Sequence, residues 1–186
     1  PWEVLESVTT PEDIDAWAMD VSLVYDVQLP MQPTLSAEYA FGSGDSDRTN
    51  VTDTITGNTL GNDTNFLYFG YLPTGYALSP RLSNLRMLKA GVSVKPLQHV
   101  SLFKELTGSV DVYRYYKDEP DGGIFDPEAS ESDRDVGFEI DLTLSWPILS
   151  DVSLAMDYGH FEPGDAYPLA SNDPTEYFSV SVTTTF

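Results

Sequence analysis

The sequence predicts an all-β protein, an antiparallel transmembrane β-barrel of about seven strands. Three observations support this prediction: apolar and polar residues alternate in seven segments, the connections between these segments alternate in length, and no convincing amphipathic helix is present. A barrel strand needs only about 9 to 11 residues with one apolar side, so the average hydropathy of such a chain stays polar. The mean hydropathy of −0.22 is therefore compatible with a membrane barrel.

Four strands are predicted in the first two thirds of the chain. They cover residues 17–29, 34–42, 84–95 and 107–117. In the first, Trp17 and Met19 begin an apolar row that alternates with Ala18 and Asp20, and the proline-containing stretch at 30–33 ends it. The other strands repeat this period of two, which places one set of side chains on each face.

Three more strands follow toward the C-terminus. They cover residues 136–146, 152–159 and 177–186. In the first of these, Phe138, Ile140 and Leu142 alternate with Glu139 and Asp141. A helix would mix both sets on every side, so this segment is a strand with one apolar and one polar face.

The connections between the predicted strands alternate in length. Those after the first and fifth strands are short, and the one after the third is intermediate. The long polar connections are residues 43–83, 118–135 and 162–175. A structureless loop of about forty residues is unusual in a compact soluble domain, whereas outer-membrane barrels have short periplasmic turns and long external loops. We therefore expect the long loops on the outside of the cell.

The number of strands predicts an incomplete barrel. Because single-chain bacterial barrels have even strand numbers, we expect residues 16–186 to be the C-terminal part of a larger barrel and residues 1–15 to be an external N-terminal segment. The remaining strands would come from the same or another chain. An eighth strand at residues 2–9 is the weaker alternative.

The C-terminal strand predicts partners of the chain. Terminal Phe186 follows Phe178, Val180 and Val182 at alternate positions, which resembles the signature that the barrel assembly machinery reads. Outer-membrane lipid and lipopolysaccharide are the other expected partners, because they surround such a barrel.

Five segments also carry a resemblance to a known family. They are PTLSAEYAFGSGD (33–45), LSPRLSNLRMLKAGVSVKPL (78–97), VDVYRYYKD (110–118), DVGFEIDLTLSW (135–146) and GHFEPGDAY (159–167). In order and spacing they resemble the C-terminal portion of the alginate export family of outer-membrane porins, over roughly residues 16–186. The resemblance implies a large monomeric β-barrel that conducts an anionic polysaccharide through an arginine-lined lumen.

The face assignment predicts a different lumen in this part of the wall. The lumen-lining candidates are Asp20, Asp26, Glu38, Lys89, Lys95, Asp111, Glu139, Asp141 and Asp157. A field of one sign in a channel repels ions of that sign, so this acidic wall predicts a preference for cations. A basic strip could form from Arg81, Arg86 and Arg114, with pairing to carboxylates as the alternative.

Composition excludes several function classes. The net charge of −21, from 9 Lys and Arg against 30 Asp and Glu, argues against nucleic acid as a partner. Without cysteine there is no thiolate nucleophile or disulfide. Glu139 and Asp141 have a spacing compatible with glycoside hydrolysis, but lumen-lining acids are commoner, so no enzyme, cofactor or metal site is predicted. Calcium binding by loop acids such as Asp45, Asp47 and Asp63 stays open, without EF-hand spacing.

The predicted function is a porin-like conduit of the bacterial outer membrane for polar or charged solutes or polysaccharide. One alternative is a structural barrel without a free pore that sheathes or anchors another outer-membrane component, such as an electron-transfer or surface complex. The other is a soluble all-β binding module. Detergent dependence separates the soluble module from the two barrels, and ion conductance separates the barrels from each other.

Overall fold

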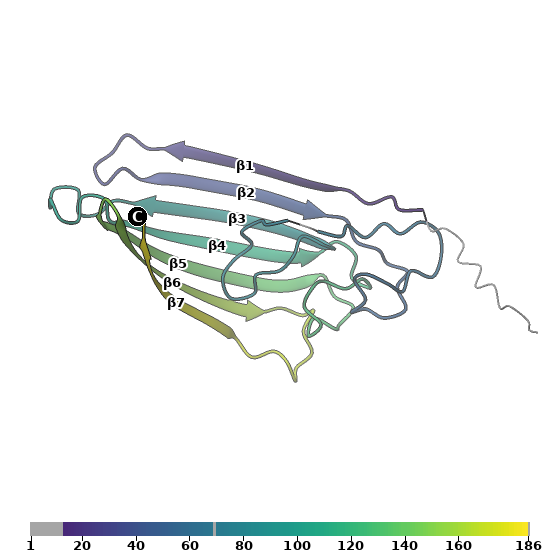
Figure 1. Ribbon diagram of the computed structural model, residues 1–186. Helices are drawn as coiled ribbons and strands as arrows, with labels where there is room; N and C mark the ends of the chain where they lie inside the picture. The colour runs from purple at the N-terminus through teal and green to yellow at the C-terminus, as the bar shows by residue number, and fades with distance from the viewer. Residues whose placement is uncertain (1–12, 69, 186) are drawn as a thin grey trace, which may run out of the picture.

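The computed structural model describes residues 13–68 and 70–185, which form one antiparallel sheet of seven strands (Figure 1). The strands are β1 (Ala18–Asp26), β2 (Thr34–Gly42), β3 (Leu85–Val94), β4 (Thr107–Lys117), β5 (Asp135–Leu149), β6 (Val152–Pro163) and β7 (Thr175–Thr184). They lie in the sheet in chain order, so the seven predicted strands and their antiparallel arrangement are confirmed. Nowhere in the described residues is there a helix with the length and apolar character that crossing a membrane requires.

The pairing register gives the sheet two chemically different faces. Residues directly opposite one another in an antiparallel pair share a face, and alternate residues of a strand do so too. We call the two sides the polar face and the apolar face. The polar face bears Glu38, Lys89, Asp111, Glu139, Asp141 and Asp157. The apolar face bears large exposed side chains that include Val21, Leu23, Leu35, Leu88, Val112, Phe138, Leu142, Phe178 and Val182.

The connections between the strands lie at two opposite ends of the sheet (Figure 1). At the turn end, residues 27–33, 95–106 and 150–151 join the strands, and at the loop end the joining segments are residues 43–84, 118–134 and 164–174. Strand β5 runs through Pro147 to Leu149, where the sequence predicted a break. A register shift between these two residues relieves the ladder at the proline, which has no N–H to donate.

The sheet is open along β1 and β7. These strands form its two edges, and no strand of residues 13–68 or 70–185 pairs with their outer sides. The predicted alternative strand at residues 2–9 and the terminal Phe186 lie outside the described residues.

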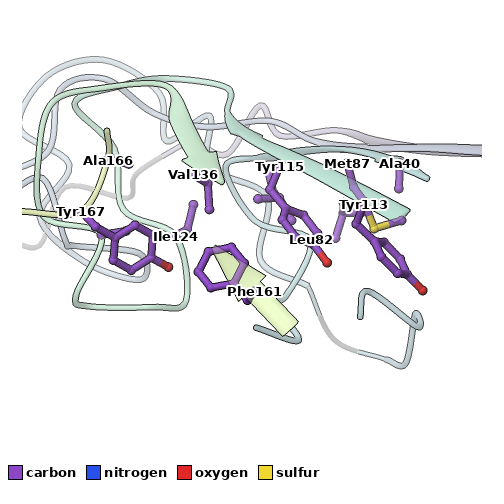
Figure 2. Packing of buried hydrophobic residues seen from close by; sticks show 12 residues of the cluster. Ala40, Leu82, Met87, Tyr113, Tyr115, Ile124, Val136, Phe161, Ala166 and Tyr167 are labelled. Carbon is purple, nitrogen blue, oxygen red and sulfur yellow. The ribbon is translucent and has the colours of Figure 1, made fainter. Parts of the chain in front are cut away.

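The hydrophobic core lies on the polar face at the loop end, between the sheet and its own loops (Figure 2). Tyr115 on β4 and Phe161 on β6 meet there with ring centroids 6.2 Å apart, and the loop residue Tyr167 lies 5.8 Å from Phe161. Ile124 and Leu82 fill the space from two other loops. The apolar face takes no part in this core, and Phe178 on it is 65% exposed.

A β-bulge moves Val136 away from its predicted face. Tyr115 pairs with Gly137 and Tyr116 with Asp135, so Val136 is the extra residue of the bulge. Its side chain is fully buried in the core instead of joining the apolar row of Phe138. A bulge shifts the alternation by one position, which is why the regular period of two misplaces this valine.

We expect Phe161→Ala to destabilise the protein by about 3 kcal/mol, because removal of a buried ring leaves a cavity that rigid neighbours fill incompletely. Denaturant unfolding in detergent measures this. The control, Phe178→Ala, should lose less, because detergent occupies the space beside an exposed ring. An equal loss in both variants would contradict a packed core beneath the loops.

Candidate functional site

Part of the β2–β3 connection folds back over the polar face of the sheet (Figure 1). We call residues 74–78 the inner loop. Its backbone amides meet the carboxylate of Glu139 on β5: the nitrogens of Tyr76 and Ala77 both lie 2.6 Å from Oε1, and that of Leu78 lies 3.0 Å from Oε2. One side chain therefore holds consecutive amides of a loop that precedes it by about sixty residues in the sequence.

Further hydrogen bonds fix the inner loop to two strands. The Tyr115 hydroxyl on β4 donates to the carbonyl oxygen of Thr74 at 2.6 Å and lies 3.3 Å from Oε2 of Glu139. The amide of Tyr76 also lies 3.1 Å from Oδ2 of Asp141. Polar groups removed from water must find partners, and these bonds supply them for both oxygens of Glu139 and for Oδ2 of Asp141.

Two glycines allow the loop backbone to come this close. Gly75 has a φ of 110°, and a Cβ there would lie 2.5 Å from the Tyr115 hydroxyl and 2.7 Å from Oε1 of Glu139. A Cβ on Gly159 of β6 would lie 2.9 Å from Cβ of Tyr76 and 3.0 Å from the Ala77 nitrogen. Gly75 provides the positive φ and Gly159 the space beneath the loop.

Acidic side chains surround the docked loop. Glu139 and Asp141 are 0% and 2% exposed, and Asp111 lies opposite Asp141 in the β4–β5 register. The nearest lysine on this face, Lys89, places Nζ 3.5 Å from Oδ1 of Asp111. Backbone amides and the Tyr115 hydroxyl, and not lysine or arginine, are therefore the direct hydrogen-bond partners that stabilise Glu139.

The register places the other predicted lumen candidates as follows. Asp20, Asp26, Glu38 and Asp157 lie on the polar face with the residues above. Lys95 follows the end of β3 at the turn end, where its Nζ lies 2.8 Å from Oε2 of Glu105. Every candidate within a strand thus shares one face, and Lys95 stands apart from them.

Two of the three arginines proposed as a basic strip, Arg86 and Arg114, lie on neighbouring strands. Arg86 and Arg114 are on the apolar face near the loop end, where they form ion pairs with Asp118 and Asp135. Arg81 lies in the β2–β3 connection. Because the first two occupy even positions in their strands, strand geometry points them away from the acidic residues of the polar face. Arg86 and Arg114 therefore pair with carboxylates, as the alternative predicted, but their partners are acids at the loop end and not the lumen candidates.

Another buried charge cluster lies in the β2–β3 connection. The guanidinium of Arg48 is 1% exposed and lies between Asp45, at 3.5 Å, and Asp63, with which it forms a close ion pair. Burial of Asp45 favours its neutral form, but the amides of Asp47 and Thr64 donate to it at 3.0 and 3.1 Å. These bonds and Arg48 lower the pKa of Asp45 below its usual value. Arg48 thus supplies a positive charge between two of the acids considered for calcium.

The described residues form neither a metal-binding cluster nor an acid pair that a substrate can reach. Within 13–68 and 70–185, no three His, Cys, Asp or Glu side chains are grouped so as to hold a metal ion. Glu139 and Asp141 lie beneath the inner loop, so a glycosidic bond has no access to them in this arrangement.

Comparison with known families agrees with this architecture. Residues 7–180 match the family described as alginate export. The chain belongs to this family. Alginate export proteins are outer-membrane β-barrels that export polysaccharide, and they are not a family of enzymes. No curated protein gave a significant match. The resemblance seen in the five sequence segments is therefore confirmed, and the antiparallel seven-stranded sheet agrees with the β-barrel fold of this family.

Sequence reasoning missed the inner loop. Alternation placed Glu139 and Asp141 on the correct face, but nothing near them in the chain indicates that Tyr76 covers them. The only local signal was the turn-forming run Pro73-Thr74-Gly75, which predicts a bend without naming what it contacts.

We expect Glu139→Ala to release the inner loop. The amides of Tyr76, Ala77 and Leu78 lose charge-assisted hydrogen bonds, and a combined loss of about 3 kcal/mol makes their exchange with solvent about a hundredfold faster. Hydrogen exchange read by mass spectrometry on the peptide covering residues 74–78 measures this.

Two further variants make the test specific. Glu38→Ala removes a carboxylate from the same face and the same cross-strand row, so it should leave exchange of that peptide unchanged. Gly159→Ala inserts a methyl group beneath Tyr76 and should release the loop with Glu139 intact. If Glu139→Ala exchanges like the unmodified protein, Glu139 does not anchor the loop.

The loop cluster around Arg48 should respond to acid. Because the folded-state pKa of Asp45 lies below the unfolded value of about 3.9, its stabilising effect is present above that pH and is lost as the pH falls through the folded value. Hydrogen exchange, corrected for the intrinsic exchange rate, measures the protection of amides near Arg48 in the β2–β3 connection. We expect this protection to be constant from about pH 7 to 5 and to fall below about pH 4. In Asp45→Asn this fall should be smaller; an identical fall would assign it to other groups.

Proposed function

We propose that this chain forms part of the wall of an outer-membrane polysaccharide conduit, with its polar face toward the lumen and its long loops outside the cell. The supporting observation is the contrast between the faces. The apolar face leaves large side chains exposed, as a lipid-facing surface requires, while the polar face bears acidic side chains and a folded loop. Family membership supports the same assignment.

The inner loop would narrow this conduit. It extends from the loop end over the middle of the polar face, where Glu139 and Asp141 on β5 hold its amides. A loop fixed by several hydrogen bonds and supported by a hydrophobic core is a stable constriction instead of a fluctuating one.

The acidic wall would favour cations and uncharged solutes over polyanions. Seven carboxylates of the polar face were predicted from sequence, and Lys89 is the basic residue among the strand-borne candidates. Lys89 is close to Asp111, so its charge is largely offset. Carboxylates along a low-dielectric channel lower the local concentration of anions.

The remaining partners follow from the outer surfaces of the sheet. Lipid would cover the apolar face, and lipopolysaccharide would meet the partly exposed Arg86 and Arg114 at the loop end. Additional strands, from the same polypeptide or another chain, would pair with the free edges of β1 and β7. Recognition by the assembly machinery through Phe186 stays a prediction, since this residue is outside the described part.

Planar-bilayer recordings test the conduit. With a potassium chloride gradient, we expect a reversal potential that indicates cation selectivity, because the polar face is acidic. Glu139→Ala should increase conductance by releasing the constriction. Lys89→Gln should increase cation selectivity, whereas Arg86→Gln, which alters the apolar face, should leave it unchanged.

The possible contrary results have different meanings. Anion selectivity would contradict the assignment of the polar face to the lumen. The absence of any conductance, also in Glu139→Ala, would favour the structural barrel without a free pore.

A further inference from the structure

Two tyrosine rings lie together on the polar face. Tyr76 belongs to the inner loop, and Tyr177 belongs to β7, where its register partner is Gly159. Their ring centroids are 5.8 Å apart with an interplanar angle of 28°. They are 36% and 40% exposed.

The exposure of this pair is not explained by core packing. Tyr113 and Tyr115, on the same face, are 4% and 0% exposed and pack within the core. Tyr76 and Tyr177 are outside that core. Two large rings left partly open among charged and hydroxyl groups are typical of a surface that binds a ligand.

Hydrogen bonds hold the Tyr76 ring in place. Its hydroxyl lies 2.8 Å from Oγ1 of Thr143 on β5, and its backbone amide is bound to Glu139. The main chain and the tip of the side chain are thus both fixed. Because the ring is already fixed, stacking of a ligand on it costs little side-chain conformational entropy, and this favours binding.

A row of hydrogen-bonding groups accompanies the rings. Thr143, Asp157 and Ser179 are register partners across β5, β6 and β7, one polar-face row nearer the turn end than Tyr177. The Ser179 hydroxyl donates to Oδ2 of Asp157 at 3.4 Å. Hydroxyl and carboxylate oxygens therefore lie beside the apolar ring surfaces.

This combination fits a pyranose ring. One side of a pyranose presents C–H groups that pack on an aromatic face, and its rim presents hydroxyls that donate to carboxylate and accept from serine or threonine. We propose that Tyr76 and Tyr177 form a sugar-stacking subsite for uncharged pyranose residues of a polysaccharide. The inference rests on the proposed function insofar as it places this subsite in the lumen.

The charges nearby select against acidic sugars. Asp157 lies in the row beside the rings, and Asp111 lies in the row of Tyr177. Lys89 is engaged by Asp111. The carboxylate of a uronic acid would meet these like charges, whereas a neutral hexose meets only hydrogen-bonding partners.

Calorimetric titration of the full protein in detergent tests the subsite. The probes are the uncharged hexamers cellohexaose and maltohexaose, and a mannuronate hexamer as the acidic counterpart. We expect at least one uncharged hexamer to bind, and the mannuronate hexamer to bind at least tenfold more weakly. Tyr76→Ala and Tyr177→Ala should each weaken binding of the uncharged probe at least tenfold, whereas Tyr177→Phe should retain it.

Tyr71→Ala is the matched control, because this ring is 88% exposed in the same β2–β3 connection but is outside the pair. It should bind like the unmodified protein. Hydrogen exchange of residues 74–78 in Tyr177→Ala verifies that the inner loop stays docked. Failure of both uncharged hexamers to bind, unchanged binding in both alanine variants, or equal binding of the mannuronate hexamer would overturn the inference.

The titration is independent of the conduit proposal. Binding that is lost in the alanine variants, in a protein without conductance, would keep the subsite and refute the conduit. Conductance without binding of either uncharged hexamer would keep the conduit and refute the subsite.

Discussion

The hydrogen bonds from the inner loop to the carboxylate of Glu139 determine the arrangement of the polar face. They attach a segment of the longest connection to the middle of the sheet, about sixty residues away in the chain. A buried carboxylate is costly without donors, and consecutive backbone amides provide them in a fixed geometry. The position of the Tyr76 ring, its contact with Tyr177 and the cover over Asp141 all depend on this attachment.

A second constraint is that one sheet must satisfy two environments. Its apolar face keeps side chains such as Leu23 and Phe178 exposed, which suits lipid and would be unfavourable in water. The hydrophobic core is consequently small and displaced, formed by loops that pack on the loop end of the polar face (Figure 2). The same loops therefore cover the loop end of the polar face.

The charge distribution of the described strands differs from the arginine-lined wall that the family resemblance implies. Most acidic side chains lie in loops or on the polar face, while Arg86 and Arg114 are on the apolar face with aspartate partners. An arginine-lined wall is therefore not formed by these strands. The geometry instead offers amides, hydroxyls, carboxylates and two open tyrosine rings, groups that suit an uncharged sugar better than a polyanion.

The sequence by itself determined the seven strands and the face of nearly every strand residue, because alternation of period two is a local property that a barrel strand must keep along its length. It also indicated the family, through the resemblance of five segments. Where local geometry departs from that period, the sequence misled: the bulge buries Val136, and β5 continues through Pro147. The attachment of Tyr76 to Glu139 and its stacking on Tyr177 were decided only by the tertiary structure. The hydrogen bonds to Glu139 come from backbone amides, which every non-proline residue carries, so no residue pattern reveals them. The stacking of the two rings follows from that attachment.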